Sequence, residues 1–129
     1  MGKLDNRVAV VTGAAQGIGK AVADKLESEG ATVVGADVQS GTTMQVDVSK
    51  EEDVKRMVED TVAEHGHLDV LVNVAAIVPF TPWDEVDFAE RRPFRAFVRS
   101  TEVLSGLAVC AAGERNKRPL RRSRVGASR

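Results

Sequence analysis

Short runs of apolar residues alternate along the first part of the chain with longer segments in which apolar positions recur every three or four residues. The runs at residues 8–11 and 70–74 are almost entirely apolar, which is typical of parallel strands buried on both faces. Further strands are expected at residues 32–36 and around residues 44–48. The alternation of these strands with amphipathic helices predicts an α/β fold built on a doubly wound parallel sheet.

Two amphipathic helices are predicted between these strands. The first covers residues 17–29, and the second begins at Ser49, where Ser49 and Glu52 have the spacing of a capping box. Gly30 and Gly66 are expected to close the two helices. The apolar positions that define the buried faces are Ile18, Val22 and Leu26 in the first helix and Val54, Met57, Val58 and Val62 in the second.

Beyond residue 79 the pattern weakens. Residues 83–90 have the spacing of a helix start, residues 98–112 have some helical spacing, and residues 115–129 are typical of a solvated basic tail. No strand is predicted after residue 91, whereas a complete doubly wound sheet needs at least two more. We therefore expect an incomplete sheet of about four strands, followed by an irregular or helical basic C-terminal segment.

Charge divides the chain near the same point. The 129 residues have a net charge of −1, but residues 1–90 carry −10 and residues 91–129 carry +9. This abrupt change suggests two segments of different origin, so we predict a folded half-domain over residues 1–90 and a basic tail over residues 91–129. One hypothesis is that the tail is disordered, or that it results from a shift of the reading frame near Glu90.

The most informative segment is residues 8–19, which read V-A-V-V-T-G-A-A-Q-G-I-G. An apolar strand passes there into a glycine-rich turn and then into a helix. A side chain at Gly13, Gly17 or Gly19 would obstruct the tight turn, the approach of a phosphate or the contact between helix and strand. The start of the helix offers free N–H groups and a positive dipole end, so the segment predicts a binding site for a pyrophosphate.

The spacing T-G-x-x-x-G-x-G at Thr12, Gly13, Gly17, Ile18 and Gly19 resembles the fingerprint of the classical short-chain dehydrogenase/reductase family. The likeness covers roughly the first 90 residues, and it implies a Rossmann-like fold that binds a nicotinamide dinucleotide. With the arguments on individual residues below, it predicts a cofactor site formed by Gly13, Gln16, Gly17, Ile18, Gly19, Asp37, Asp47, Val48, Asn73 and Ala75.

Asp37 ends the second predicted strand, about 20 residues after the glycines, where a carboxylate accepts hydrogen bonds from the adenosine ribose of NAD. A 2′-phosphate there would be repelled, since two like charges 4 Å apart cost about 4 kcal/mol at an effective dielectric constant of 20. Members of the family that prefer NADP usually place a basic residue just before the second glycine or just after the strand. This chain has Gln16 and Val38 at those points, so NAD is the predicted cofactor. The alternative for Asp37 is a solvated loop acid.

Two further pairs of residues extend the resemblance. Asp47 and Val48 are similar to the family's adenine pocket, in which the acid accepts a hydrogen bond from the adenine amino group. The alternative for Asp47 is an Asx-turn residue before the helix. Asn73 and Ala75 match the family's N-N-A-G segment, from which two neighbouring positions depart. The resemblance implies that Asn73 steadies the strand end beside the cofactor, and the alternative is an ordinary strand-ending turn.

No catalytic residue is assigned. Members of the family use an Asn, a Ser and a Tyr-x-x-x-Lys helix, in which the lysine lowers the pKa of the tyrosine that transfers a proton. The chain contains no tyrosine, and Ser100 and Ser105 precede the expected serine strand without its sequence context. The resemblance therefore implies the cofactor-binding half of an NAD-dependent oxidoreductase. The full enzyme would transfer hydride between nicotinamide and a secondary alcohol or carbonyl, and this chain is predicted to be inactive alone.

Other classes of function are disfavoured. His65 and His67 lack a third ligand, so we expect solvated histidines and no metal site. No apolar run is long enough to span a membrane, and the basic tail lacks the interleaved aromatic residues of a nucleic-acid-binding surface. The single cysteine, Cys110, favours a reducing compartment, so a cytoplasmic location is expected. Full-length members of the family commonly form homo-oligomers, but the resemblance does not carry an oligomeric state over to this chain.

Two alternatives stay open on the sequence alone. The first is a non-catalytic module that binds a dinucleotide or a partner without turnover. The second is a translation product with no folded state. Regulated binding of a partner would favour the first alternative, and a circular dichroism spectrum without helical signal would favour the second.

Overall fold

The computed structural model describes residues 2–76, 95–96 and 98–108. Within these ranges, four strands form one parallel sheet in the order β3-β2-β1-β4. The strands are β1 (Val8–Thr12), β2 (Thr32–Asp37), β3 (Met44–Gln45) and β4 (Val70–Asn73). The predicted order of elements and the parallel sheet are therefore confirmed.

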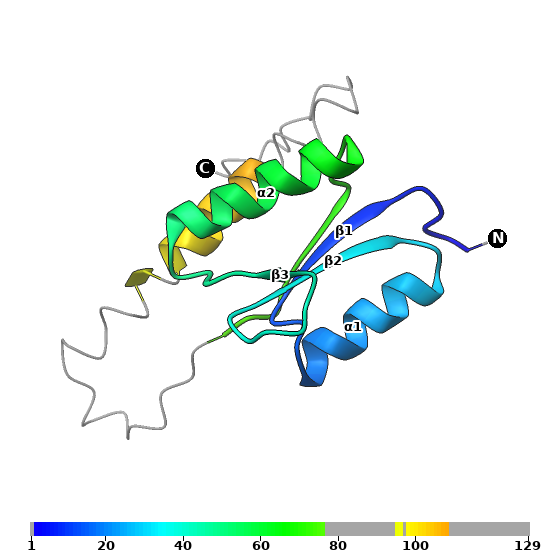
Figure 1. Cartoon of the computed structure of the whole chain (residues 1–129), viewed down its shortest axis with the longest axis horizontal. Helices are drawn as coiled ribbons and strands as arrows, with labels where there is room; N and C mark the ends of the chain where they lie inside the picture. The colour runs from blue at the N-terminus through cyan, green and yellow to red at the C-terminus, as the bar shows by residue number, and fades with distance from the viewer. Residues whose placement is uncertain (1, 77–94, 97, 109–129) are drawn as a thin grey trace, which may run out of the picture.

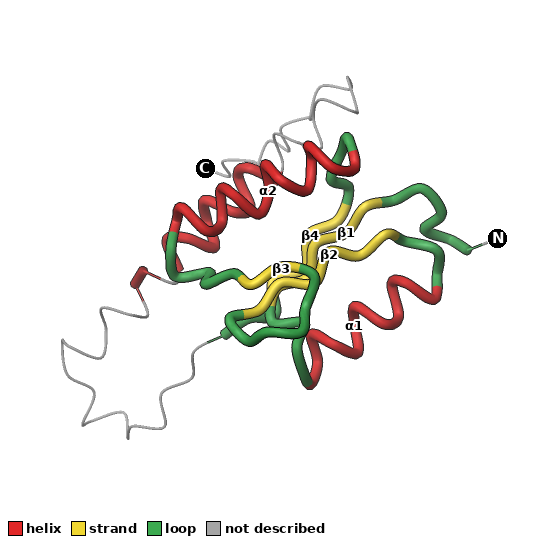
Figure 2. Tube along the Cα trace, viewed as in Figure 1, coloured by secondary structure: helices red, strands yellow, loops and turns green. Residues whose placement is uncertain are grey.

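β1 lies inside the described sheet, between β2 and β4 (Figure 2). Thr12 is paired with Ala36 of β2 and with Asn73 of β4, so the carboxyl ends of the three strands lie close together. The four side chains of Val8–Val11 are at most 3% exposed. β1 is thus buried on both faces, as its apolar sequence predicts.

Helices cover both faces of the sheet (Figure 1). α1 (Gly17–Ser28) packs on one face, and α2 (Glu51–His65) packs on the other together with a helix at residues 98–108. α2 ends directly before the predicted Gly66, which has φ +81°. α1 ends at Ser28, two residues before the predicted Gly30, which has φ +97°. This is the layered arrangement of a Rossmann-like, doubly wound fold.

Two hydrophobic clusters lie on the two faces of the sheet. The smaller cluster joins Val11 of β1 and Ala14 to Ala23 of α1. The larger cluster joins the opposite face of the sheet to α2 and to the helix at residues 98–108; its buried members are Val10, Val34, Ala36, Val46, Val54, Met57, Val58, Leu68, Leu104 and Ala108. Successive residues of β1 therefore face different helical layers, which follows from the twofold side-chain period of a strand.

Two strands differ from the prediction. β3 contains only Met44 and Gln45, whereas residues 44–48 were expected to form a strand. The side chains of Val70–Val72 in β4 are only half-buried, although the run is apolar. β4 is an edge strand of the described sheet, so its side chains have sheet neighbours on one side only.

The start of α2 also corrects the prediction. The helix begins at Glu51, and no side chain caps its first turn. The Ser49 hydroxyl donates instead to Asp47 Oδ1 at 2.6 Å, and the Asp47 N–H donates to Asp53 Oδ2 at 3.0 Å. The acid that reaches back is therefore Asp53 rather than Glu52, because the carboxylate of Asp47 already holds the serine.

The helix at residues 98–108 falls within the segment for which helical spacing was predicted. Leu104 is fully buried and Ser100 is 3% exposed, so this helix contributes to the core. The predicted helix start at residues 83–90 and the basic residues 109–129 lie outside the described residues. The boundary near residue 91 and the origin of the tail stay predictions. No helix in the described ranges is long and apolar enough to cross a membrane.

Candidate functional site

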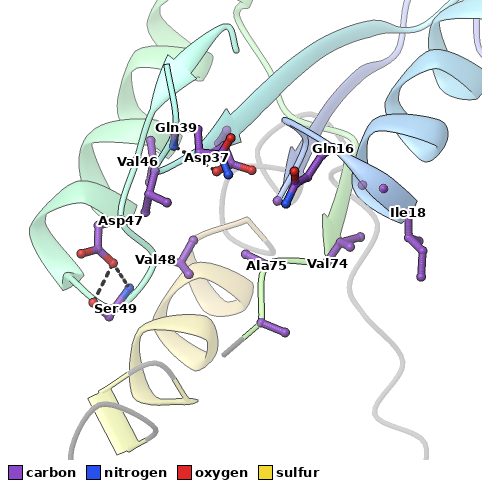
Figure 3. A pocket seen from close by; sticks show the side chains of 16 residues that line it. Gln16, Ile18, Asp37, Gln39, Val46, Asp47, Val48, Ser49, Val74 and Ala75 are labelled. Carbon is purple, nitrogen blue, oxygen red and sulfur yellow. Dashed lines mark hydrogen bonds between the residues drawn. The ribbon is translucent and has the colours of Figure 1, made fainter. Parts of the chain in front are cut away.

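A cavity of about 640 Å³ lies at the carboxyl ends of β1, β2 and β4. Its walls come from Gly13 and from residues 16–19, 36–39, 46–49 and 74–76 (Figure 3). Parallel α/β sheets place their ligand sites at this edge. Asn73 does not line the cavity. The other nine predicted site residues do line it, and they are Gly13, Gln16, Gly17, Ile18, Gly19, Asp37, Asp47, Val48 and Ala75.

Gly13 and Gly19 permit close backbone packing beside the cavity. Gly13 has φ +69°, and a Cβ on it would lie 2.7 Å from the Ala75 nitrogen and 2.9 Å from the Ala75 Cα. A Cβ on Gly19 would overlap the carbonyl oxygen of Gly13. The turn after β1 therefore fits against the end of β4 on one side and against the start of α1 on the other.

Gly17 has a different environment. Its φ is +59°, and a Cβ on it would meet no atom within 4 Å. The first turn of α1 contains no acidic residue, and the side chain of Gln16 at the N-cap makes no capping hydrogen bond. The N–H groups at the start of α1 thus adjoin an open cavity, with no acidic side chain in their own turn, which is the geometry of an anion site.

Asp37 connects the end of β2 to the glycine-rich loop. The Ala15 N–H donates to Asp37 Oδ2 at 3.1 Å, and the Gln39 N–H donates to Asp37 Oδ1 at 3.0 Å. The next bond along the loop is from the Ala14 N–H to the carbonyl oxygen of Ala36, at 3.3 Å. The carboxylate therefore lines the cavity in a defined orientation. Asp37 is thus bonded to the backbone through both oxygens, unlike the solvated loop acid of the alternative interpretation.

Thr12 connects the end of β1 to the segment that follows β4, on the other side of β1 from Asp37. Its hydroxyl oxygen accepts the N–H of Val74 at 3.2 Å and the N–H of Ala75 at 3.3 Å. Thr12 is 1% exposed. The sequence motif predicts Thr12 only as part of the glycine-rich turn and does not predict this role. The available signal was a polar residue at the end of an otherwise apolar buried strand.

Asn73 lies outside the cavity wall, beside the helix at residues 98–108. Its side-chain Nδ2 donates to Ser105 Oγ over 3.5 Å, the long limit for a hydrogen bond. Asn73 and Ser105 both line a smaller hollow along the edge of β4. The structure thus places Asn73 between the strand end and this helix, one residue before the segment that borders the cavity.

Asp47 makes the local turn that was the alternative to an adenine contact. Its Oδ1 accepts the Ser49 N–H at 2.9 Å and the Ser49 hydroxyl at 2.6 Å (Figure 3). These bonds and the nearby Lys50 hold the pKa of Asp47 below its usual value, with the Ser49 hydroxyl as the largest cause. Asp47 nevertheless lines the cavity, so the turn and a contact with a ligand do not exclude each other.

Replacing Ser49 by alanine is expected to raise the pKa of Asp47, because the strongest donor to the carboxylate is lost. An acid with a lowered pKa in the folded state stabilises the fold above its ordinary value of about 3.9, and this contribution disappears as the pH falls. The stability difference between wild type and S49A should therefore shrink on acidification. Carboxyl NMR titration measures the pKa, and Ser28→Ala is the control because Ser28 bonds only the Lys25 carbonyl. An unchanged pKa in S49A would contradict the assignment.

Two exposed apolar side chains border the cavity. Ile18 is 75% exposed and Val38 is 57% exposed. Apolar groups at this level of exposure beside a cavity are available to cover a flat ring. The sequence points to Val38 only as the residue that stands where NADP-preferring members of the family have a basic side chain. The lining residues absent from the predicted set are Ala36, Val38, Gln39, Val46, Ser49, Val74 and Ala76, and most of them adjoin predicted residues at the strand ends.

The histidines lie away from the cavity, and both side chains are partly exposed. His67 Nε2 is 3.2 Å from Asp69 Oδ2 and 3.2 Å from the carbonyl oxygen of Asn6. The side chains of His65 and His67 are only 24% and 22% exposed. Asp69 pairs with the start of β1, which is the opposite end of that strand from the cavity. In the described ranges, no three His, Cys, Asp or Glu side chains are grouped as metal ligands would be.

The serines considered for catalysis also lie outside the cavity. Ser100 is buried in the core, and the Ser105 hydroxyl donates to the carbonyl oxygen of Thr101 at 2.9 Å. Neither residue lines the cavity. The described part of the chain thus contains a cavity bordered by a glycine-rich turn, the Asp37 carboxylate at the end of β2 and exposed apolar side chains.

A parallel sheet with this glycine-rich turn and carboxylate defines a dinucleotide-binding fold of the Rossmann class. The family model for "short chain dehydrogenase" matches residues 7–95. The chain belongs to the short chain dehydrogenase family.

Similar proteins include enzymes of known name. The chain is 40% identical to cis-4-hydroxycyclohexanecarboxylate dehydrogenase of Sinomonas cyclohexanicum, over 81% of this chain and 46% of that protein. It is 38% identical to tropinone reductase-like 1 of Erythroxylum coca, over 59% of this chain and 33% of that protein. A crystal structure of a short chain dehydrogenase from Burkholderia cenocepacia in complex with NADP has a TM-score of 0.79 and 26% identity, over 86% of this chain and 53% of that chain. The chain therefore spans about a third to a half of the length of these proteins.

Proposed function

We propose that the cavity binds NAD. The observation that carries this proposal is that the carboxylate of Asp37 lines the cavity. Its negative charge would repel the 2′-phosphate of NADP. Its two oxygens are oriented by the N–H groups of Ala15 and Gln39, and each oxygen retains capacity to accept a further hydrogen bond. Two ribose hydroxyls are donors that match this arrangement.

The choice of NAD over NADP rests on charge. No lysine or arginine is among the described residues that line the cavity, and Asp37 is negative. A 2′-phosphate beside this carboxylate would face repulsion of about 4 kcal/mol at 4 Å and an effective dielectric constant of 20, with no lining cation to offset it. The relative from Burkholderia cenocepacia holds NADP, whereas the charge of the residue at position 37 favours NAD here.

The other parts of the cofactor are assigned to the remaining walls. The diphosphate would lie over Gly17 at the start of α1, where the N–H groups adjoin open space. The adenine would lie between Val38 and Val48, with Asp47 near its amino group. The nicotinamide side would extend toward residues 74–76. Bound in this way, the cofactor would supply a hydride acceptor or donor, while the chain supplies binding and orientation.

We propose no turnover by this chain alone. The family's reaction is hydride transfer between nicotinamide and a secondary alcohol or carbonyl, with a tyrosine as the proton donor or acceptor. The chain contains no tyrosine, and no residue of the described cavity is assigned to proton transfer. The proposal is therefore a cofactor-binding half of an NAD-dependent oxidoreductase, with the cytoplasm as its expected compartment.

Calorimetric titration tests this proposal. NAD is expected to bind with a dissociation constant at least tenfold lower than that of NADP, because only NADP brings a second negative charge to Asp37. An alcohol-oxidation assay run on the same sample is expected to show no turnover. Equal affinity for the two cofactors would overturn the preference for NAD, and absence of binding to either would overturn the proposed function.

Replacing Gly17 by alanine is expected to weaken NAD binding tenfold or more, because a methyl group would project into the open space assigned to the diphosphate. The free energy of unfolding should fall only by about 1–2 kcal/mol, the cost of a positive φ for alanine. Gly41→Ala is the matched control, since Gly41 also has a positive φ and open space but does not line the cavity. Equal NAD affinity in G17A and G41A would contradict the placement of the diphosphate.

A further inference from the structure

We propose that Asp37 is also a positioning residue for the glycine-rich loop. In this account, its carboxylate holds the loop in the shape that receives the diphosphate, in addition to selecting the ribose. The inference rests on the proposed function, because it concerns the same cavity. It adds a second role, which requires the residue at position 37 to accept a hydrogen bond from the Ala15 N–H.

The contact that carries the inference joins two segments 22 positions apart in the sequence. The Ala15 N–H donates to Asp37 Oδ2 at 3.1 Å, and the receiving group is a carboxylate. A hydrogen bond to a charged acceptor is about twice as strong as a bond between neutral groups. The other oxygen is fixed by the Gln39 N–H at 3.0 Å, so the carboxylate does not turn freely away from the loop.

On this side the loop is otherwise held by a long backbone hydrogen bond and by the packing of the Ala14 methyl group against Gly35 of β2. The Ala14 N–H donates to the Ala36 carbonyl oxygen at 3.3 Å, which is longer than the usual 2.9–3.0 Å of an N–H···O bond. A Cβ on Gly17 would meet no atom within 4 Å, and the Gln16 side chain makes no capping hydrogen bond. Only Gln16 separates Ala15 from the start of α1. A displacement of Ala15 would therefore move the N–H groups that are assigned to the diphosphate.

The opposite side of the loop is held differently. Gly13 packs against the backbone of Ala75, and Thr12 holds the N–H groups of residues 74 and 75. The loop is thus fixed to β4 by steric fit and part-buried hydrogen bonds, and to β2 by the Asp37 carboxylate, a long backbone bond and the packing of Ala14. Asp37 is the part of this support that a substitution can remove without altering the backbone.

Two substitutions at this position separate the roles. Asp37→Asn removes the charge but keeps one carbonyl oxygen, which can accept the Ala15 N–H. Asp37→Ala removes both the charge and the acceptor. If Asp37 only selects the ribose, both variants should lose affinity for NAD, and both should bind NADP equally well. If Asp37 also positions the loop, D37A should bind NADP about tenfold more weakly than D37N. This fold-change corresponds to about 1.4 kcal/mol, the size of effect expected when the neutral acceptor for the Ala15 N–H is lost.

Hydrogen exchange of the Ala15 amide supplies a readout that requires no cofactor. In the ligand-free full chain, this amide is expected to exchange slowly in wild type and in D37N, and at least tenfold faster in D37A. Equal exchange and equal NADP affinity in the two variants would overturn the positioning role. If D37A does not fold, the wild type still decides, since exchange of its Ala15 amide at the rate of an unstructured peptide would also overturn the inference. Failure of NAD to bind wild type, with Ala15 protected, would overturn the proposed function and leave the positioning role standing.

Discussion

Replacing Gly13 by alanine is expected to lower the free energy of unfolding by about 3 kcal/mol or more, combining the cost of positive φ with that of a steric clash. The new Cβ would lie 2.7 Å from the Ala75 nitrogen and 2.9 Å from the Ala75 Cα. Both are backbone atoms, and the Ala75 N–H is already bound to the Thr12 hydroxyl, so the end of β4 cannot easily move away. Urea denaturation followed by circular dichroism measures the effect.

Gly41→Ala is the matched control for G13A. Gly41 has φ +99°, and a Cβ on it would meet no atom within 4 Å. G41A therefore carries the cost of the backbone conformation without the clash, and we expect a loss of about 1–2 kcal/mol. Equal losses in G13A and G41A would mean that the approach of the loop to β4 is looser than described.

Replacing Leu104 by alanine is expected to cost about 2–5 kcal/mol of stability, the range observed when a large aliphatic side chain is removed from a packed core. Leu104 is fully buried in the cluster that includes Met57 and Val54 of α2. For a domain of this size such a loss is a large part of the total stability. Thermal and urea unfolding of the purified chain measure it.

The result for L104A also bears on the basic segment that begins near residue 91. Val98 lies in the same helix but is 39% exposed, so Val98→Ala should change stability by less than about 1 kcal/mol. If L104A costs no more than V98A, the helix at residues 98–108 does not contribute to the core. The prediction that residues 91–129 form a separate tail would then be favoured.

The sequence predicts the sheet well because the strong signals are local. β1 is an unbroken apolar run, and a strand with such a sequence must be covered on both faces. The glycines after β1 are likewise recognisable, because few side chains tolerate positive φ or the approach of another backbone. β3 and β4 were predicted less well, since their length and burial depend on neighbours that a single segment does not reveal.

The contacts that support the loop could not be predicted in the same way. The bond from the Ala15 N–H to Asp37 depends on how β1 and β2 are aligned and on the path of the turn that follows β1. The double acceptor role of Thr12 requires the end of β4 to lie beside it, 62 and 63 residues later in the sequence. Asp47 is the opposite case, because its turn with Ser49 is only two residues long, and the sequence already allowed it.

A dinucleotide is proposed to bind at the carboxyl ends of β1, β2 and β4. The most direct measurement is a map of amide chemical shifts in the ¹⁵N-labelled chain during titration with NAD. We predict that the shifts concentrate at residues 13–19, 37–39 and 47–48, and that amides near His67 and Asp69, at the other end of β1, stay unchanged. Shifts centred on that other end, or saturating NAD without any shift at Gly17 and Asp37, would contradict the account.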